Sequence, residues 1–301
     1  MRRMYRASLI GLVLVIAMIS AACGGGDADD TTTTEAAAET TTTTVVEFDL
    51  NASVNDYLST IPEGFLAIGD VDVFKEGVEA SGALVIDVRE TSEYEEGHVP
   101  GAVNIPLRTL GANLDKIPTD RQVYVYCKSG FRAGQALSSL GMLGYDNVLS
   151  YKPGWNGWTE TGQDVSTEAV EAEVVGAPDI APELVAAVNG FLSTIPEGWL
   201  SAGGAEDVQA ALDAGAIALD VRTAGEYEEG NVEGSLHIDI RELAVGIEGV
   251  STSANVVTYC GSGHRSAMAL AALHVLGADN VKAYGGSYTS LVDVGIPIAT
   301  P

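Results

Sequence analysis

Cysteines and basic residues are both scarce in this sequence. Only three cysteines occur among 301 residues, and 15 lysines and arginines stand against 42 aspartates and glutamates, a formal net charge of −27. Binding to a phosphate backbone requires a basic face, so this balance argues against nucleic acid as a partner. A disulfide-stapled secreted domain would have an even, clustered set of cysteines, and metal-type spacing is also absent. Chemistry therefore explains the cysteines better than cross-linking does, and we expect no cofactor and no metal.

The N-terminus has the pattern of an export signal. Three arginines precede an apolar run over residues 7–19, which is too short for a confident membrane span. The following Ser20-Ala21-Ala22-Cys23 resembles the cleavage box of bacterial lipoproteins, with Ser20 where leucine is usual. The resemblance implies a signal peptide over residues 1–22 and an extracytoplasmic protein anchored to the bacterial cell membrane through a lipid on Cys23. A plain secretory signal, giving a soluble secreted or periplasmic protein, is the alternative.

A low-complexity segment separates this signal from the rest of the chain. From residue 24 to about residue 44 the sequence consists almost entirely of Gly, Asp, Ala and Thr, with two threonine runs. Such a segment has almost no apolar side chains to bury, which predicts a disordered tether. We therefore assign residues 23–50 to the lipidated cysteine and its tether.

The remainder of the sequence repeats itself once. The heptapeptide Leu-Ser-Thr-Ile-Pro-Glu-Gly at residues 58–64 returns at residues 192–198, and later motifs return in the same order. A period this long indicates two duplicated domains rather than a solenoid. We place the first repeat at residues 51–166, an acidic linker at residues 167–181 and the second repeat at residues 182–301. The heptapeptide is duplicated with the rest, so we assign it to each domain as a helix and turn.

Within each repeat, short apolar runs alternate with helical stretches. The runs are typical of strands buried on both faces, and glycines are plausible helix stops. This order predicts an α/β fold with a parallel sheet flanked by helices in each of two tandem domains. The predicted strands are residues 83–87, 122–126, 216–220 and 255–259, and the predicted helices are residues 133–143 and 266–276.

A cysteine loop follows one predicted strand of each repeat. A cysteine at the carboxyl end of a strand, just ahead of a helix, faces unpaired backbone N–H groups and the positive end of the helix dipole. Both favour the reactive thiolate. Gly130 and Gly263 let the backbone curl into an anion nest, and Arg132 and Arg265 add positive charge. This cradle suits a cysteine that carries a sulfur atom as a persulfide. The loops are Cys127-Lys128-Ser129-Gly130-Phe131-Arg132 and Cys260-Gly261-Ser262-Gly263-His264-Arg265.

Three ordered motifs span most of the first repeat. The residues are Asp87-Val88-Arg89, Glu93-Tyr94, Gly97-His98-Val99-Pro100-Gly101-Ala102 and Asn104-Ile105-Pro106, then Cys127-x-x-Gly130-x-Arg132, then Gly154-Trp155-x-x-Trp158 with Gly162. In this order they resemble the N-terminal signature, the active-site loop and the C-terminal signature of rhodanese domains.

The resemblance implies sulfurtransferase activity with Cys127 and its counterpart Cys260 as catalytic cysteines. It implies a small donor such as thiosulfate and a thiol or cyanide-like acceptor. The resemblance also implies that the Asp-x-Arg pairs support the architecture of the site. Each aspartate could equally be a hydrogen-bonded residue at the end of a strand. These pairs are Asp87 with Arg89 and Asp220 with Arg222.

The second repeat departs from these signatures outside its loop. Asn231, Glu233 and His237 replace the histidine, proline and asparagine, and the C-terminal signature lacks its tryptophans. Variable loop positions, whose side chains should line the pocket mouth, also differ: Lys128 and Phe131 correspond to Gly261 and His264. We therefore expect different substrate preferences at the two sites. Among the other histidines and tryptophans, we expect His98 and His264 to have a surface or capping role rather than contact with anionic substrates, His274 to be structural, and Trp155 and Trp158 to be core.

Two other functions remain open at this stage. A phosphatase or arsenate reductase of the same fold would hold a tetrahedral oxyanion in a loop one residue longer than the Cys-x4-Arg spacing found here. A non-enzymatic persulfide carrier or recognition module would show sulfur loading with little turnover. The physiological donor, the acceptor and the oligomeric state do not follow from the residues.

Overall fold

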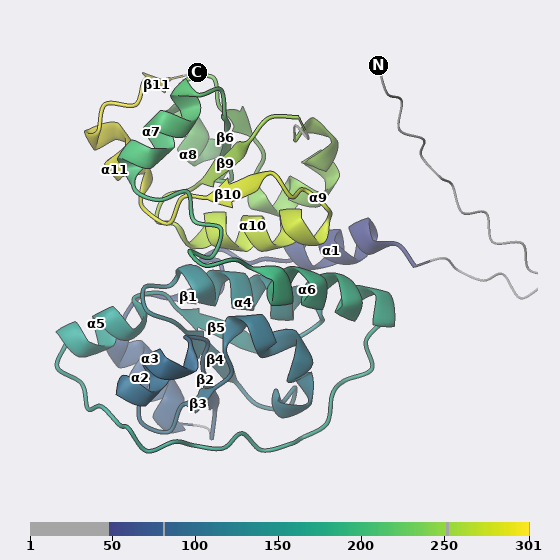
Figure 1. Cartoon of the computed structure of the whole chain (residues 1–301), viewed down its shortest axis with the longest axis vertical. Helices are drawn as coiled ribbons and strands as arrows, with labels where there is room; N and C mark the ends of the chain where they lie inside the picture. Colours follow the sequence, from purple (N-terminus) through teal and green to yellow (C-terminus); the bar gives the residue numbers. More distant parts are fainter. Residues whose placement is uncertain (1–47, 81, 251–252, 301) are drawn as a thin grey trace, which may run out of the picture. The chain divides into compact units, whose positions relative to one another are not determined.

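The computed structural model describes residues 48–80, 82–250 and 253–300 (Figure 1). The predicted signal peptide, the lipidation site Cys23 and nearly all of the tether lie outside the described residues. The described chain belongs to one compact unit, Glu47–Pro301. Within the described residues, no helix has the length and apolar character needed to cross a membrane.

The first repeat contains one five-stranded parallel sheet with helices around it. The strand order is β1-β5-β4-β2-β3, so β4, which leads into the Cys127 loop, is the central strand. The elements are α1 (Leu50–Ser59), β1 (Ala67–Ile68), α2 (Val71–Ala80), β2 (Leu84–Asp87), α3 (Thr91–Glu96), β3 (Val103–Asn104), η1 (Leu107–Ala112), η2 (Leu114–Lys116), β4 (Val123–Tyr126), α4 (Phe131–Met142), β5 (Val148–Tyr151) and α5 (Gly154–Glu160).

The second repeat has the same central strands, but its parallel sheet has four strands instead of five. Its parallel sheet has the order β10-β9-β6-β8, and β11 and β7 form a separate two-stranded antiparallel sheet. The elements are α6 (Pro182–Thr194), α7 (Ala205–Asp213), β6 (Ile217–Asp220), α8 (Ala224–Glu229), β7 (Asn231–Val232), β8 (Leu236–His237), η3 (Ile240–Glu242), α9 (Leu243–Gly246), η4 (Ile247–Gly249), β9 (Val256–Tyr259), α10 (His264–Val275), β10 (Val281–Ala283), α11 (Tyr288–Asp293) and β11 (Ile298–Ala299).

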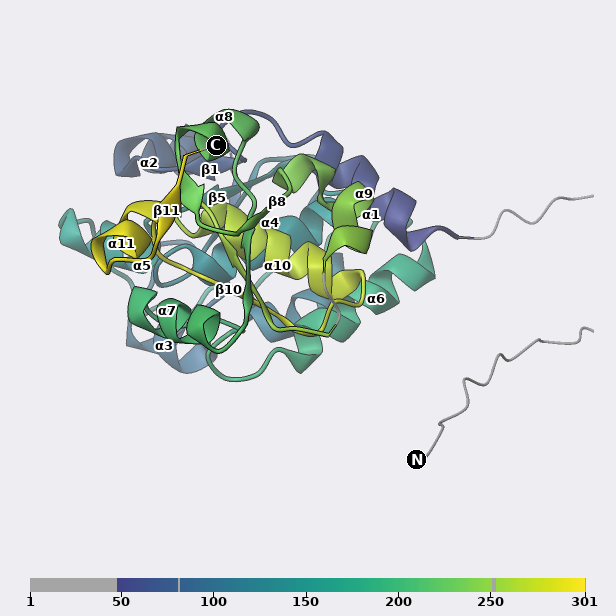
Figure 2. The same ribbon diagram turned by 90° about the horizontal axis from the view of Figure 1, so that it is seen from above.

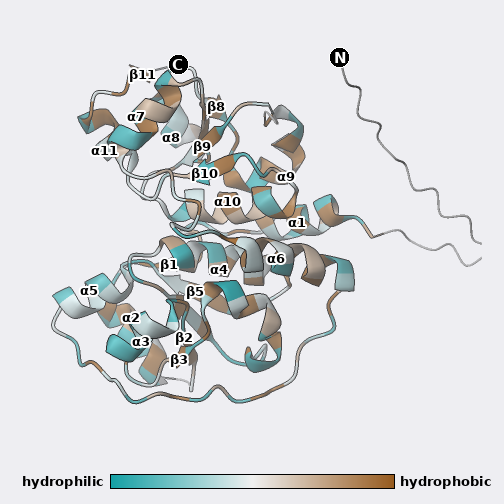
Figure 3. Cartoon of the chain, viewed as in Figure 1, coloured by the Kyte–Doolittle hydropathy of each residue, from teal (hydrophilic) through white to brown (hydrophobic). Residues whose placement is uncertain are grey.

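The predicted α/β fold with parallel sheets is therefore confirmed, and the four predicted strands form as β2, β4, β6 and β9. Every residue of β4 and β9 is buried, as the continuous apolar runs indicate. Both predicted helices form but begin two residues early, because Gly130 and Gly263 adopt left-handed φ values of 88° and 83° as N-caps. The loop arginines consequently belong to the first helical turn. The helices carry both hydrophobic and hydrophilic residues on their surfaces (Figure 3). This is expected for helices that cover a sheet with one apolar face.

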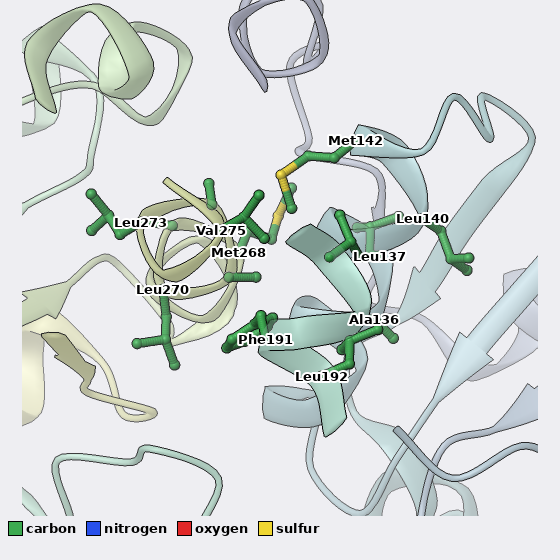
Figure 4. Close-up of a cluster of buried hydrophobic side chains, with 14 of the residues drawn as sticks. Ala136, Leu137, Leu140, Met142, Phe191, Leu192, Met268, Leu270, Leu273 and Val275 are labelled. Carbon is green, nitrogen blue, oxygen red and sulfur yellow. The ribbon is translucent and has the colours of Figure 1, made fainter. Parts of the chain in front are cut away.

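The helices that follow the two cysteine loops, α4 and α10, pack against each other (Figures 1 and 2). Small residues allow the close approach: a Cβ added at Gly134 would lie 3.1 Å from the Cβ of Ala267 and 3.1 Å from the carbonyl oxygen of His264. Leu137 and Met142 of α4, Phe191 of α6 and Met268 of α10 belong to the hydrophobic cluster shared by both repeats (Figure 4). The two loops thus lead into helices that share one core.

The linker is hydrogen-bonded along the first repeat. Ser166 and His98 exchange backbone hydrogen bonds of 3.0 and 2.9 Å, and the amide of Val175 donates to the carbonyl of Asp115 at 2.8 Å. The side chain of His98 is fully buried and bonds the carbonyls of Tyr94 and Glu168. His98 therefore caps the last turn of α3 and ties the linker to it, so the capping role expected for it is found and the surface position is wrong.

Candidate active site

Cys260 lies at the carboxyl end of β9, where its loop curls around the sulfur. The backbone amides of Gly263 and Ser266 donate to its Sγ at 3.1 and 3.4 Å, and the hydroxyl of Ser266 lies 3.9 Å away. A Cβ on Gly263 would collide with the carbonyl oxygen of Gly285, so this position requires glycine. Converging N–H donors at a helix N-terminus stabilise negative charge on the sulfur.

Cys127 occupies the equivalent place after β4. Gly130 again has a positive φ, and a Cβ there would collide with the carbonyl oxygen of Lys152. Ala133 stands where the second loop has Ser266, so the Cys127 site lacks this hydroxyl. Within the described part of the chain, only the Cys260 sulfur accepts hydrogen bonds from its loop. Both cysteines are reduced and nearly inaccessible, with 1% of Cys127 and 0% of Cys260 exposed.

Each loop arginine forms a two-pronged ion pair with a glutamate in the first turn of a short helix, Glu93 of α3 or Glu226 of α8. Arg132 donates to Glu93 at 2.5 and 2.8 Å, and Arg265 donates to Glu226 at 2.6 Å from both nitrogens. The Arg265 hydrogen bonds lower the pKa of Glu226 to about 2. Burial opposes the charge of Arg265, yet Glu226 and the nearby Cys260 together raise the pKa of this arginine. A fixed cation therefore stands beside each cysteine.

The Asp-x-Arg pairs form a buried network on the neighbouring strand. Arg89 bonds Asp87 at 2.7 Å and the carbonyl of Gly97 at 2.6 Å, and the hydroxyl of Tyr126 donates to Asp87 at 2.6 Å. Tyr126 immediately precedes Cys127, so the network holds the end of β4 against the end of β2. In the second repeat Arg222 likewise bonds Asp220 and the carbonyl of Gly230, each at 2.6 Å. The hydroxyl of Tyr259 has other partners there: it donates to the hydroxyl of Ser235 at 3.3 Å and accepts from the amide of Val232 at 3.0 Å.

The loop side chains of the two sites are placed differently. Lys128, Ser129 and Ser262 are exposed, and Gly261 and Phe131 are partly exposed. His264 is buried, so its expected place at the pocket mouth is wrong. Its position in the first turn of α10 presses it onto Gly134, where a Cβ would lie 3.3 Å from Nδ1. Burial, with Lys152 nearby, lowers the pKa of His264 to about 4 and keeps it neutral near pH 7.

The two tryptophans of the C-terminal signature and His274 have mainly structural contacts. Trp158 is buried, as expected, and donates to the carbonyl of Asp164 at 2.8 Å. Trp155 is only partly buried and lies over Arg89, with 4.7 Å between the guanidinium carbon and the ring centre. His274 bonds the carbonyl of Val281 at 3.0 Å, which joins α10 to β10 as a structural histidine would.

Sequence reasoning assigned no role to the glutamates or to Ser266. Glu93 and Glu226 stand in a duplicated Glu-Tyr-Glu-Glu-Gly motif, which was the available signal. Nothing in the motif identified the arginine as their partner, because 39 residues separate each pair. Ser266 follows the loop arginine directly, and its hydroxyl becomes relevant only when the helix turn carries it toward the sulfur.

A family model and several known proteins are similar to parts of this chain. The model of the rhodanese-like domain family matches residues 70–161 and 204–293. A putative sulfur carrier protein of Bacillus subtilis is 34% identical over 34% of the chain and 52% of its own length. A thiosulfate:glutathione sulfurtransferase of Saccharomyces cerevisiae is 31% identical over 29% of the chain and 73% of its own length. The crystal structure of a 3-mercaptopyruvate sulfotransferase of Escherichia coli is 22% identical, covering 74% of this chain and 98% of its own, with a TM-score of 0.37.

The matches to curated relatives are partial. The chain spans about half the length of the Bacillus subtilis carrier protein, and both of these curated matches involve about a third of the chain.

Proposed function

The chain belongs to the rhodanese-like domain family, and on that premise we propose that it is an extracytoplasmic sulfurtransferase acting through cysteine persulfides. Its relatives support sulfur transfer as the general activity. The proposed donor is thiosulfate or a compound like it, and the proposed acceptor is a thiol or cyanide-like nucleophile. The observation that carries the proposal is the pair of amides, of Gly263 and Ser266, directed at the Cys260 sulfur.

In the first proposed step the thiolate attacks the outer sulfur of the donor. A new S–S bond forms on the cysteine, the donor S–S bond breaks, and sulfite leaves with its electron pair. The terminal persulfide sulfur is then an anion, which the amides and Arg265 stabilise. In the second step the acceptor attacks this terminal sulfur, and the cysteine leaves as a thiolate. No proton, electron or further reactant is needed.

The test is mass spectrometry of the mature protein after exposure to thiosulfate. We expect a mass gain of one sulfur at Cys127 and at Cys260, each abolished by substitution of that cysteine with serine. No gain at either cysteine would overturn the proposal. p-Nitrophenyl phosphate serves as the comparison substrate, because hydrolysis of it without sulfur loading would favour the phosphatase alternative.

A persulfide carrier is the second candidate, favoured by the similarity of one repeat to the putative sulfur carrier protein of Bacillus subtilis. Steady-state turnover of thiosulfate with cyanide separates the two functions. An enzyme turns over many times per site, whereas a carrier loads one sulfur and stops.

Export and membrane attachment are part of the same proposal and depend on the sequence around Cys23. The intact-mass spectrum of protein purified from a bacterial host tests them. We expect a chain that begins at Cys23 and carries a diacylglyceryl group, and the variant Cys23→Ala should remain unlipidated. Cleavage near Ala22 without added lipid would instead support a soluble secreted form.

A further inference from the structure

Each of the segments that lead into the two repeats packs mainly on the other repeat, which is an exchange of leading segments. We call residues 50–66 and 182–200 the leading segments of the first and second repeats. Helix α1 of the first leading segment packs on α9 and η3 of the second repeat, and the amide of Asn51 donates to the carbonyl of Ala244 at 3.0 Å. Helix α6 of the second packs on η1 of the first repeat. Figure 1 shows α1 next to α9 and α6 next to α4.

An arginine of the opposite repeat donates hydrogen bonds to the turn of each leading segment. Arg108 of the first repeat donates to the carbonyls of Ile195 and Pro196 at 2.7 and 3.0 Å. Arg241 of the second repeat donates to the carbonyl of Ile61 at 2.9 Å. The turns are the duplicated Ile-Pro-Glu-Gly sequences, so the exchange is reciprocal and uses equivalent residues.

Each turn ends in an aromatic ring that covers the loop arginine of the opposite repeat. The guanidinium carbon of Arg132 lies 4.7 Å from the ring centre of Trp199, and that of Arg265 lies 4.5 Å from the ring centre of Phe65. The amide of Gln135, one helical turn after Arg132, donates to the carbonyl of Trp199 at 2.8 Å. An aromatic face attracts a guanidinium, most strongly when both are shielded from water.

The backbone at both rings is in a conformation that bulky residues rarely adopt. Phe65 and Trp199 have φ values of 55° and 61°, and the leucine after each has the same left-handed conformation. Such conformations cost on the order of 1 kcal/mol or more each and persist where surrounding contacts hold them. The same strained turn, in two positions of one chain, places a ring on the arginine beside the opposite cysteine.

We propose that Trp199 and Phe65 are positioning residues that act across the repeats. Trp199 holds Arg132 of the Cys127 site, and Phe65 holds Arg265 of the Cys260 site. The aromatic ring covers the face of each guanidinium, and the glutamate bonds its edge. Together they hold the positive charge in one position beside the cysteine. The consequence for sulfur transfer rests on the proposed function, whereas the effect on the local charge does not.

The test measures anion preference at each cysteine separately. Cys260→Ser leaves only the Cys127 site and Cys127→Ser leaves only the Cys260 site. Both variants also carry Cys23→Ala, which removes the third thiol. In each background the full chain is alkylated with anionic iodoacetate and with neutral iodoacetamide, and the ratio of the two rates is compared. A general loosening of the fold changes both rates together, whereas a displaced arginine lowers the ratio.

We expect a crossed result from Trp199→Leu and Phe65→Leu, each of which is the control for the other. Trp199→Leu should lower the ratio at Cys127 roughly threefold to tenfold and leave the ratio at Cys260 unchanged. Phe65→Leu should do the reverse. Trp199→Phe and Phe65→Trp, which keep a ring, should have the same alkylation ratios as the chain with the native residue. An effect within the same repeat, equal effects at both sites, or no effect would each overturn the proposal.

Gln135→Met gives a second variant that leaves the ring and its turn intact. Met268 occupies the equivalent position of the second repeat, so methionine suits this helix position. Loss of the hydrogen bond to Trp199 should lower the ratio at Cys127 alone, and an unchanged ratio there would count against the proposal.

Persulfide formation with thiosulfate is then measured on the same variants. Crossed alkylation ratios with no persulfide in the wild-type chain would overturn the proposed function and leave the cross-repeat positioning standing.

Discussion

Both terminal nitrogens of Arg265 lie 2.6 Å from carboxylate oxygens of Glu226. This pair fixes a cation against the loop that surrounds Cys260, and Arg132 with Glu93 repeats it at Cys127. A carboxylate that accepts both arms of a guanidinium fixes its plane as well as its position. The arginine can therefore contribute a directed charge to the loop rather than a mobile one.

Removal of the carboxylate should impair one site at a time. With Glu226→Gln, one arm of the pair and its charge are lost, and we expect sulfur loading at Cys260 to slow roughly tenfold. Glu93→Gln should act in the same way on Cys127. Mass spectrometry over time after addition of thiosulfate measures both sites in one sample. Equal slowing of both sites by either variant would refute a local role.

The loop glycine should be irreplaceable because of its surroundings as well as its φ. Gly130 and Gly144 have φ values of 88° and 87°, but an added Cβ collides with the Lys152 carbonyl only at Gly130. Gly144→Ala should cost about 1 kcal/mol of unfolding free energy and keep sulfur loading at Cys127. Gly130→Ala should abolish loading at Cys127. Urea unfolding and mass spectrometry give the two measurements, and normal loading in Gly130→Ala would contradict the role of the curled backbone.

The repeated apolar runs were sufficient to predict the strands that carry the cysteines. β4 and β9 are buried on both faces, and few other structures suit a four-residue run of that kind between polar segments. The glycines at positions 130 and 263 also identified the curled loop. They did not fix the start of the helix, because a left-handed glycine can precede a helix as its N-cap as readily as it can end one.

The partners of the leading segments could not be predicted in this way. The sequence indicates that α1 and α6 have apolar faces, but burial is non-directional and does not specify which repeat receives them. Phe65 and Trp199 follow the duplicated turn, and their contact with a distant arginine depends on the exchange itself. The sequence analysis expected His264 at the pocket mouth for a related reason. Its burial comes from the packing of α10 on α4 at Gly134, which the sequence does not specify.

The variable loop position next to each cysteine should set the preference for anionic donors. Lys128 is exposed, and its counterpart is Gly261. An exposed cation steers anions weakly and is screened by salt. We expect Lys128→Gly to lower the second-order rate of sulfur loading from thiosulfate at Cys127 by about threefold at low ionic strength, and Gly261→Lys to raise it at Cys260. The differences should shrink in 0.5 M salt, and differences that do not change with salt would exclude electrostatic steering.

His264 should make the protein less stable as the pH falls through the weakly acidic range. Its pKa is lowered by burial from 6.5 to about 4, so the unfolded chain binds a proton below pH 6.5 that the folded chain rejects until about pH 4. The unfolding free energy should therefore fall between these values, by at most about 1.4 kcal/mol per pH unit.

His264→Phe, the residue found at the equivalent Phe131, should remove this dependence. Urea unfolding of both proteins between pH 7 and pH 4 measures the difference, in which the contributions of the other histidines cancel. The Glu226 carboxylate affects mainly lower pH, because its stabilising contribution is lost as the pH falls from its ordinary value of 4.5 toward about 2. Parallel curves for wild type and variant above pH 4.5 would show that His264 binds its proton equally well in the folded and unfolded chains.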